Sequence, residues 1–296
     1  MRRNVVIQGA QGNNSFVLGG RAARGVAVMG IVNRTPDSFY DRGATFALDA
    51  AVAAALAQAD AGAYLVDIGG VPFGAGPAVS EQEEIDRVVP VVAAIAAASD
   101  VAVSVDTFNA EVARLSILAG ASVINDTSGL FDERMATVVA ASDATLVLTH
   151  SLAPPRSAPP RPEYADVVAE VVEFLRDRVD RAVAAGIPRE RLVVDPGHDL
   201  NKNTLHSIEI TRRLEEVVAI GLPTLVAVSR KDFVGETLDA AKEQRLEGSL
   251  AVAVACVLKG ARIVRVHDVA ATVAAMRMTE ALLGLREPAY LRHNMG

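Results

Sequence analysis

The chain has 296 residues, of which 51% are hydrophobic and 22% are charged, and its net charge is −7. This length and composition fit one globular domain, predicted to span residues 1–296. The negative charge, without any basic run carrying interleaved aromatic residues, excludes a nucleic-acid-binding surface. The lone Cys256 excludes a disulfide within the chain, and every apolar stretch is too short for a membrane span. We therefore expect a cytoplasmic protein with no membrane or nucleic-acid partner.

The first segment, residues 1–20, is predicted to form a β-hairpin. Two short strands, Asn4–Gln8 and Ser15–Leu18, flank a turn at residues 9–14. We expect this hairpin to close the bottom of the main sheet.

Eight short apolar runs follow, and each stops at a polar residue. Buried parallel strands read as unbroken Val/Ile/Leu runs, and an Ala-rich helical pattern follows each run here. Eight strand-then-helix units predict a closed (β/α)8 TIM barrel, whose active site lies where the strands end. The predicted strands are Val26–Val32, Ala63–Val66, Val101–Val105, Ala121–Ile124, Ala144–Leu148, Leu192–Val194, Pro223–Val228 and Ala261–Val264.

The helices are predicted between these strands from their apolar periodicity. Ser80 and Glu83 form a capping-box pair at the start of the second helix. Four helices end in Ala-Gly or Lys-Gly, which predicts glycine C-caps at Gly62, Gly120, Gly186 and Gly260. The predicted helices cover 47–61, 80–98, 109–118, 132–141, 164–185, 203–219, 244–259 and 268–283.

The segment 151–163, after the fifth predicted strand, is rich in proline. Five prolines lie within Ser151–Pro162, which precludes a helix and favours an extended path. Its PxxP pattern is also typical of ligands for partner domains. We favour a long barrel loop, because functional barrels carry long loops at this end.

Cationic residues follow the seventh and eighth strands. Lys231 comes directly after the seventh, and Arg265 and His267 follow the eighth. The loops after these two strands are the usual phosphate-binding corner of a TIM barrel, where helix N-termini also favour anions. We therefore predict an anion cluster there. Asn33, at the end of the first strand, could supply an oxygen to Mg²⁺ bound on a phosphate.

Polar acceptors end the strands on the side that we expect to face this corner. Asp106, Asn125 and Asp195 provide two carboxylates beside one amide. Such a set suits the amino and ring N–H donors of an aminopyrimidine-like ring.

With their neighbours, these residues resemble the dihydropteroate synthases from Met29 to about Met278. Each motif is weak alone, but eight in order at the right strand ends are specific. They are Met29–Phe39, Asp67–Gly70, Ser104–Thr107, Ile124–Asp126, Asp195–Gly197, Ser229–Lys231, Gly248–Ala251 and Arg265–Asp268. Members of this family join a pterin-methyl diphosphate to p-aminobenzoate, release diphosphate, and usually form homodimers.

The resemblance implies a role for each candidate residue. Arg265 would lie against the pterin face, His267 and Asn33 would meet the diphosphate and its Mg²⁺, and Ser229 would lie near the aminobenzoate carboxylate. The candidate substrate-binding residues are Asp67, Asp106, Asn125, Asp195, Ser229, Lys231 and Arg265, the candidate catalytic residues are Lys231, Arg265 and His267, and Asn33 is the candidate metal ligand.

Two loops depart from the family pattern. After Gly70 the pattern continues Glu-Ser-Thr-Arg-Pro-Gly, but this chain has Val71–Pro77, without the Thr or the Arg. After Gly197 the pattern is Phe-Gly-Phe-Gly-Lys, but here residues 198–202 read His-Asp-Leu-Asn-Lys. Methionines that flank the fifth-strand His in the pattern are Thr149 and Ser151 here.

A further change in the first loop places Arg34 at an apolar position and Tyr40 at a serine. Arg34 offers a substitute for the missing cation.

We therefore predict a dihydropteroate synthase homologue, a transferase by family, with little or no synthase activity and a partial pterin and diphosphate site. The expected ligands are a pterin, diphosphate with Mg²⁺ and p-aminobenzoate analogues. One alternative is a working synthase in which Arg34 or Arg42 compensates. Others are a pterin-binding methyltransferase domain, which the first-, seventh- and eighth-strand motifs disfavour, and a non-catalytic ligand sensor.

Overall fold

The computed structural model describes residues 15–34, 47–72, 74–157 and 161–294. The N-terminal hairpin pairs β1 (Ser15–Leu18) with β2 (Arg21–Arg24), antiparallel. Gly19 and Gly20 connect them with φ values of 58° and 72°, which favour glycine in a two-residue hairpin turn. Ser15–Leu18 is thus a strand, as predicted. It pairs with β2, a strand that was not predicted. The other predicted strand, Asn4–Gln8, lies outside the described residues.

Eight parallel strands form the main sheet, as predicted. Their spatial order is β8-β7-β6-β5-β4-β3-β10-β9, and a parallel bridge from Val194 to Thr224 joins the two ends into a barrel. β9 is shorter than predicted, and the proline at 223 just before it has no N–H for the ladder. The strands are β3 (Ala27–Asn33), β4 (Leu65–Gly69), β5 (Ala102–Asp106), β6 (Val123–Asp126), β7 (Thr145–Thr149), β8 (Leu192–Asp195), β9 (Leu225–Val226) and β10 (Ile263–Val266).

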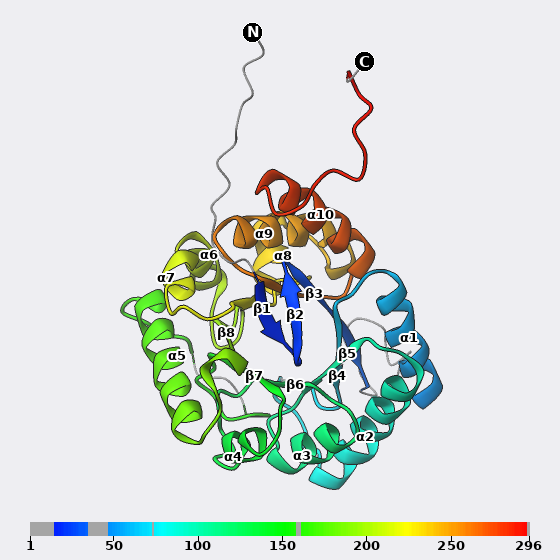
Figure 1. The fold of residues 1–296 in the computed structure, drawn as a ribbon. Helices are drawn as coiled ribbons and strands as arrows, with labels where there is room; N and C mark the ends of the chain where they lie inside the picture. The colour runs from blue at the N-terminus through cyan, green and yellow to red at the C-terminus, as the bar shows by residue number, and fades with distance from the viewer. Residues whose placement is uncertain (1–14, 35–46, 73, 158–160, 295–296) are drawn as a thin grey trace.

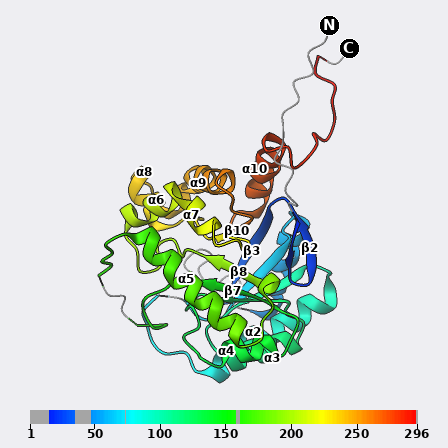
Figure 2. The same ribbon diagram turned by 60° about the vertical axis from the view of Figure 1, so that its left-hand side comes forward.

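The helices surround this barrel (Figure 1, Figure 2). They are α1 (Leu48–Asp60), α2 (Glu81–Ala98), α3 (Ala110–Leu118), α4 (Met135–Ala140), α5 (Val167–Ala184), α6 (Thr204–Arg212), α7 (Leu214–Val218), α8 (Asp232–Leu238), α9 (Leu246–Leu258) and α10 (Val269–Leu282). The predicted helix 203–219 is divided at Arg213, and α8 was not predicted. The four predicted cap glycines have φ between 97° and 115°, which confirms their role.

Local capping follows the sequence in part. The Ser80 hydroxyl accepts from the Glu83 amide at 3.2 Å, as the capping box predicts. The Glu83 carboxylate, however, pairs with Arg87 one turn later on α2. Among the described residues, no helix is both long and apolar enough to cross a membrane.

The interior of the barrel begins with an apolar layer that contains a residue from every strand. Its members are Met29, Leu65, Ala102, Val123, Val147, Val193, Leu225 and Ile263, joined by Ala27 and by Leu18 from the hairpin. Leu18 thus seals the bottom of the barrel, and β1 and β2 lie over the centre of the ring of helices in Figure 1. This layer is the floor on which the polar residues of the opposite end rest.

Candidate ligand-binding site at the mouth of the barrel

The polar interior residues occupy the layer above this apolar floor. Side chains of a strand alternate between its two faces, so residues two positions along from the floor also point inward. On six strands these are Asp67, Ser104, Asn125, Thr149, Asp195 and Arg265. Two positions further, at the mouth, come Asn33, Asp106, Ser229 and His267. Strand periodicity alone therefore brings nearly all the predicted site residues to one place.

Asp67 is the centre of a buried hydrogen-bond network. Its Oδ1 accepts from the Ser104 hydroxyl at 2.6 Å, and its Oδ2 accepts from Asn125 Nδ2 at 3.1 Å. Arg265 Nε donates to the same Oδ2 at 2.6 Å, and Arg265 Nη2 donates to Asp106 Oδ2 at 2.8 Å. One guanidinium thus joins the carboxylates of two neighbouring strands.

This arrangement corrects one expectation. The acceptors were expected opposite the anion corner, yet Arg265 lies directly on Asp67 and Asp106. Arg265 is on β10 and Asp67 is on β4. Only β3 lies between these two strands, so the long Arg265 side chain reaches Asp67. The acceptor set and the cationic corner therefore share a residue.

Two acceptors in this layer are buried without a partner in the described part of the chain. They are Asn125 Oδ1 and Thr149 Oγ1. The Asn125 amide is fixed by its Nδ2, which faces the acceptor-only Asp67 carboxylate. A buried polar atom left unpaired is costly, so these two oxygens indicate a ligand that donates to Asn125 Oδ1 and that donates to or accepts from the Thr149 hydroxyl.

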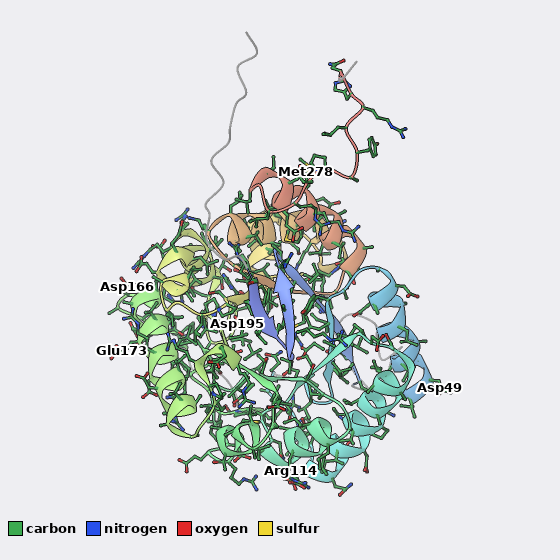
Figure 3. The ribbon with its side chains drawn as sticks, viewed as in Figure 1. Asp49, Arg114, Asp166, Glu173, Asp195 and Met278 are labelled. Atoms are coloured by element: carbon green, nitrogen blue, oxygen red, sulfur yellow. The ribbon has the colours of Figure 1, made fainter. Side chains whose placement is uncertain are left out.

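Burial changes the charge states of the site. It raises the pKa of Asp106 to about 6, against the opposing effect of Arg265. It also raises the pKa of Asp195 to about 6, although the Gly197 amide and Lys231 favour the ionised form. Burial lowers the pKa of Lys231, which faces Asp195 and Asp199. Figure 3 shows Asp195 inside the ring of helices.

His267 contributes hydrogen bonding to the corner and no charge. Its Nδ1 lies 3.1 Å from the Ser229 hydroxyl, which also accepts from the His267 amide at 3.2 Å. Burial and the neighbouring Arg265 lower the pKa of His267 to about 3, so the ring is neutral at pH 7. The cationic part of the predicted cluster therefore consists of Lys231 and Arg265.

Comparison with known proteins identifies the family. The model of the family described as pterin binding enzyme matches residues 29–267. A Mycobacterium leprae protein named inactive dihydropteroate synthase 2 is 45% identical over 88% of this chain and 92% of its own length. The Escherichia coli dihydropteroate synthase is 42% identical over 88% and 93%, respectively. The chain belongs to the dihydropteroate synthase family.

Solved structures of this family share the fold closely. The Yersinia pestis dihydropteroate synthase in a sulfonamide drug complex superposes with a TM-score of 0.87 at 40% identity, covering 92% of this chain and all of its own (100%). The Xanthomonas albilineans dihydropteroate synthase with 4-aminobenzoic acid gives a TM-score of 0.84 at 40% identity, covering 91% and 98%.

In this barrel, the unusual residues of the altered loops bond to neighbouring segments. Arg34 Nη1 donates to the carbonyls of Asp86 at 3.1 Å and of Arg87, both on α2. Asp199 Oδ2 accepts from the Asp232 and Phe233 amides at 2.7 and 3.3 Å, at the start of α8. Arg42, the other suggested substitute, lies outside the described residues.

A buried lysine that was not among the predicted site residues lies beside Asp195. Lys202 Nζ lies 2.8 Å from His150 Nδ1 and donates to the Leu200 carbonyl at 2.9 Å. Burial lowers the pKa of Lys202 to about 7, opposed by Asp195. The one sequence signal that could have identified Lys202 is its position as the last residue of the altered motif at residues 198–202.

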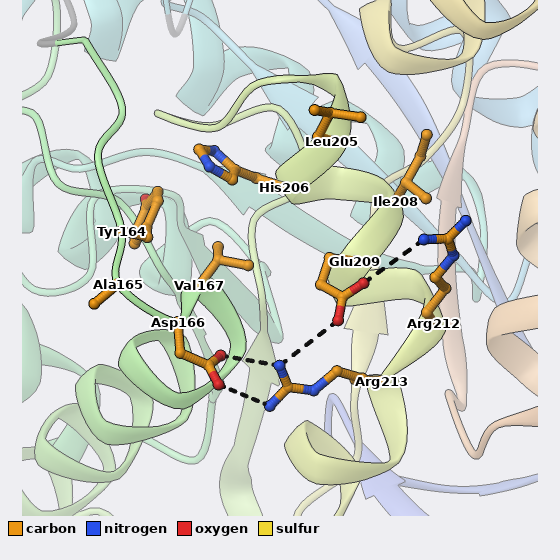
Figure 4. Close-up of a pocket in the computed structure, with 10 residues that line it drawn as sticks. All are labelled: Tyr164, Ala165, Asp166, Val167, Leu205, His206, Ile208, Glu209, Arg212 and Arg213. Atoms are coloured by element: carbon orange, nitrogen blue, oxygen red, sulfur yellow. Dashed lines mark hydrogen bonds and ion pairs between the residues drawn. The ribbon is translucent and has the colours of Figure 1, made fainter.

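A surface cavity of about 450 Å³ lies elsewhere, between the starts of α5 and α6 (Figure 4). Its charged groups satisfy one another: Arg213 pairs with Asp166 at 3.1 Å and with Glu209 at 3.6 Å. Tyr164 donates to the Asn201 carbonyl at 2.9 Å. This cavity carries none of the predicted site residues.

No group of three acidic, histidine or cysteine side chains within the described ranges could hold a metal ion by itself. A Mg²⁺ ion carried on a diphosphate needs only one or two protein oxygens. Asn33 Oδ1 lies at the mouth of the barrel, 3.6 Å from the position that a Cβ on Gly69 would take.

Proposed function

We propose that this protein is a dihydropteroate synthase homologue that binds a pterin and diphosphate but has little or no synthase activity. The observation that carries the proposal is the contrast between two parts of one site. The acceptors Asp106, Asn125 and Asp195 are all in place, with one amide oxygen unpaired. The second loop has neither the hydroxyl nor the cation of the family motif.

The pterin would bind through its donors. Its amino and ring N–H groups would pair with Asp106, Asn125 Oδ1 and Asp195, and Lys231 would serve a ring acceptor. Arg265 would remain on Asp67 and lie against the ring face, since its guanidinium plane is already fixed in this layer. Solved relatives hold pterin-type and aminobenzoate-type molecules: one contains 7,8-dihydropteroate and another 4-aminobenzoic acid.

The diphosphate would lie at the corner formed by Lys231, Arg265 and His267. Two cations and a neutral imidazole N–H suit a leaving group whose charge grows as the bond to it breaks. Mg²⁺ would neutralise part of that charge, with Asn33 as its protein ligand. Ser229 holds His267 in place through the 3.1 Å contact.

The loss of the Thr hydroxyl and the Arg cation at the second loop is large enough to explain impaired catalysis. A charged hydrogen bond to a phosphate is worth about 1.5–3 kcal/mol, and ~1.4 kcal/mol is a factor of ten in rate. Arg34 is bound to α2 and therefore does not replace the missing cation, and Asp199 adds a second negative charge near Lys231. The M. leprae relative named inactive agrees with this proposal.

We further propose that residues 1–296 form one domain that pairs into a homodimer through α9 and α10. The exposed apolar side chains there, Leu258, Met278 and Leu282, support such a face.

A steady-state assay tests the function. Pterin-methyl diphosphate, p-aminobenzoate and Mg²⁺ would be supplied to this protein and to the E. coli synthase under identical conditions. We expect kcat/KM at least about a hundredfold below that of the synthase, from the loss of about two well-placed contacts. Comparable values would show that this chain is a working synthase.

A further inference from the structure

The loops after β4 and β7 meet although their strands are not neighbours. In the barrel, β5 and β6 lie between β4 and β7. Adjacent strands are about 4.8 Å apart, so these two loops begin roughly 14 Å from each other. Along the rim of the barrel, the ends of β5 and β6, which carry Asp106 and Asn125, lie between these two loops.

Arg156, in the Pro-rich loop after β7, makes that contact. Its Nη1 donates to the Pro72 carbonyl at 2.9 Å and to the Gly74 carbonyl, both in the loop after β4. Its Nη2 and Nε donate to the Pro77 carbonyl at 2.9 and 3.3 Å. The guanidinium is thus enclosed by main-chain oxygens of a single loop.

Two backbone features fit this insertion. Arg156 has a φ of 62°, a left-handed conformation that a non-glycine residue keeps only where its surroundings impose it. A Cβ on Gly76 would lie 2.3 Å from Arg156 Nη2. The absence of a side chain at Gly76 therefore makes room for the guanidinium.

We propose that Arg156 fastens the segment after β7 to the carbonyls of Pro72, Gly74 and Pro77 as a strap across the mouth of the barrel, and that this strap limits access of ligand to the acceptors beneath it. Pro154 and Pro155 directly precede Arg156, and their restricted φ angles limit the positions that Arg156 can take. The identity of the ligand rests on the proposed function, whereas the strap itself does not.

Limited digestion with trypsin tests the strap in the full chain, because trypsin cuts after arginine. The variant Gly76→Ala keeps Arg156 but displaces its guanidinium, and residue 76 has no left-handed φ that alanine would strain. We expect cleavage after Arg156 to be about tenfold faster in Gly76→Ala, since proteolysis follows the population of the open form. Arg161→Ala, in the same loop and exposed, is the control and should match the wild type. Equal cleavage rates in wild type and Gly76→Ala would overturn the strap.

Stopped-flow binding of a plain pterin tests the control of access. Arg156→Ala and Gly76→Ala should each raise the association rate constant about tenfold, and Arg161→Ala should leave it unchanged. Unchanged association in both strap variants would refute the control of access even if digestion shows that the strap exists. A pterin that binds to none of these proteins would refute the proposed function and the control of pterin access, and the digestion would still decide the strap.

Discussion

Asp106 must serve Arg265 and a ligand at the same time. Its Oδ2 already accepts from Arg265 at 2.8 Å, and its Oδ1 accepts from Thr127 at 3.2 Å. A carboxylate has about four lone-pair positions, so one remains on each oxygen. Arg265 therefore helps to keep Asp106 ionised without using up its capacity to accept from a ring.

Pterin binding should depend on pH through this carboxylate. The pKa of Asp106 is about 6, so the acceptor is ionised above that pH and carries a proton below it. We expect affinity to be constant near pH 8 and to fall up to about tenfold per pH unit below pH 6 for each carboxylate that must ionise. Calorimetry between pH 5 and pH 8 measures this. An affinity that rises toward pH 5 would contradict the placement.

Replacing Asp106 by Ala should remove pterin binding at every pH, because ring donors would then be buried unpaired. Glu111→Gln, a change at a partly exposed carboxylate on α3, is the control and should bind as the wild type does. Unchanged affinity in Asp106→Ala would place the ring elsewhere.

Glu84 on α2 is another buried carboxyl close to this site. It accepts from the Thr107 hydroxyl at 2.6 Å, and burial raises its pKa from 4.5 to about 7. Between those pH values the folded protein keeps a proton that the unfolded chain has lost. Stability is therefore lost as the pH rises from about 4.5 to 7, by at most about 3 kcal/mol for this group.

The variant Glu84→Gln should remove that loss, and the Thr107 hydroxyl can still donate to the amide oxygen. Relative to the wild type, it should be up to about 3 kcal/mol more stable at pH 8 than at pH 4. Denaturant unfolding at both pH values measures the difference. Glu81→Gln, exposed on the same helix, should show no such dependence. The same pH response in both variants would assign the effect to general charge.

At the scale of elements, the second loop is the part to which we assign the proposed loss of synthase activity. Exchanging residues 71–76 for Glu-Ser-Thr-Arg-Pro-Gly restores the hydroxyl and the cation, and it also removes the carbonyl arrangement that holds Arg156. We expect synthase turnover to rise at least about tenfold, the value of one charged contact. The same exchange in an Asp106→Ala background should give no rise. If the loop exchange alone gives no gain in synthase turnover, the defect lies in the sixth loop, at residues 198–202.

At the scale of the whole molecule, the net charge of −7 gives an anion no general attraction. Under the proposed function, diphosphate with Mg²⁺ would instead be held locally, at the corner of Lys231 and Arg265. Because any ligand selective for the folded state stabilises it, we expect diphosphate to raise Tm, less so in added salt. The shift should vanish in a Lys231→Ala, Arg265→Ala double variant. A shift that persists there would place the anion at another site.

The outer face of α10 should form the dimer. Met278 and Leu282 are 59% and 65% exposed, and Figure 3 shows Met278 on the outside of the ring. We expect light scattering to give a dimer at micromolar concentration and a monomer in Leu282→Asp. Leu118→Asp, a 73% exposed leucine on α3, should remain dimeric. A monomeric wild type would refute the proposal.

The sequence by itself determined the barrel and the composition of its polar layer. Apolar runs repeated eight times predict the strands, and the alternation of side chains along each strand sends Asp67, Asn125, Asp195 and Arg265 inward. Both signals are local, because they depend only on residues within one strand. The cap glycines were predictable for the same reason.

Only the tertiary structure decided which partners the long side chains take. Arg265 lies on Asp67, Arg34 on α2, and Arg156 on the loop after β4, and each contact joins segments at least 52 residues apart. The helix α8 and the contact of Lys202 with His150 likewise depend on how neighbouring loops fold over the strand ends. A flexible cationic side chain binds the oxygens that the folded barrel brings within its reach. The residues beside it in the sequence do not determine which oxygens these are.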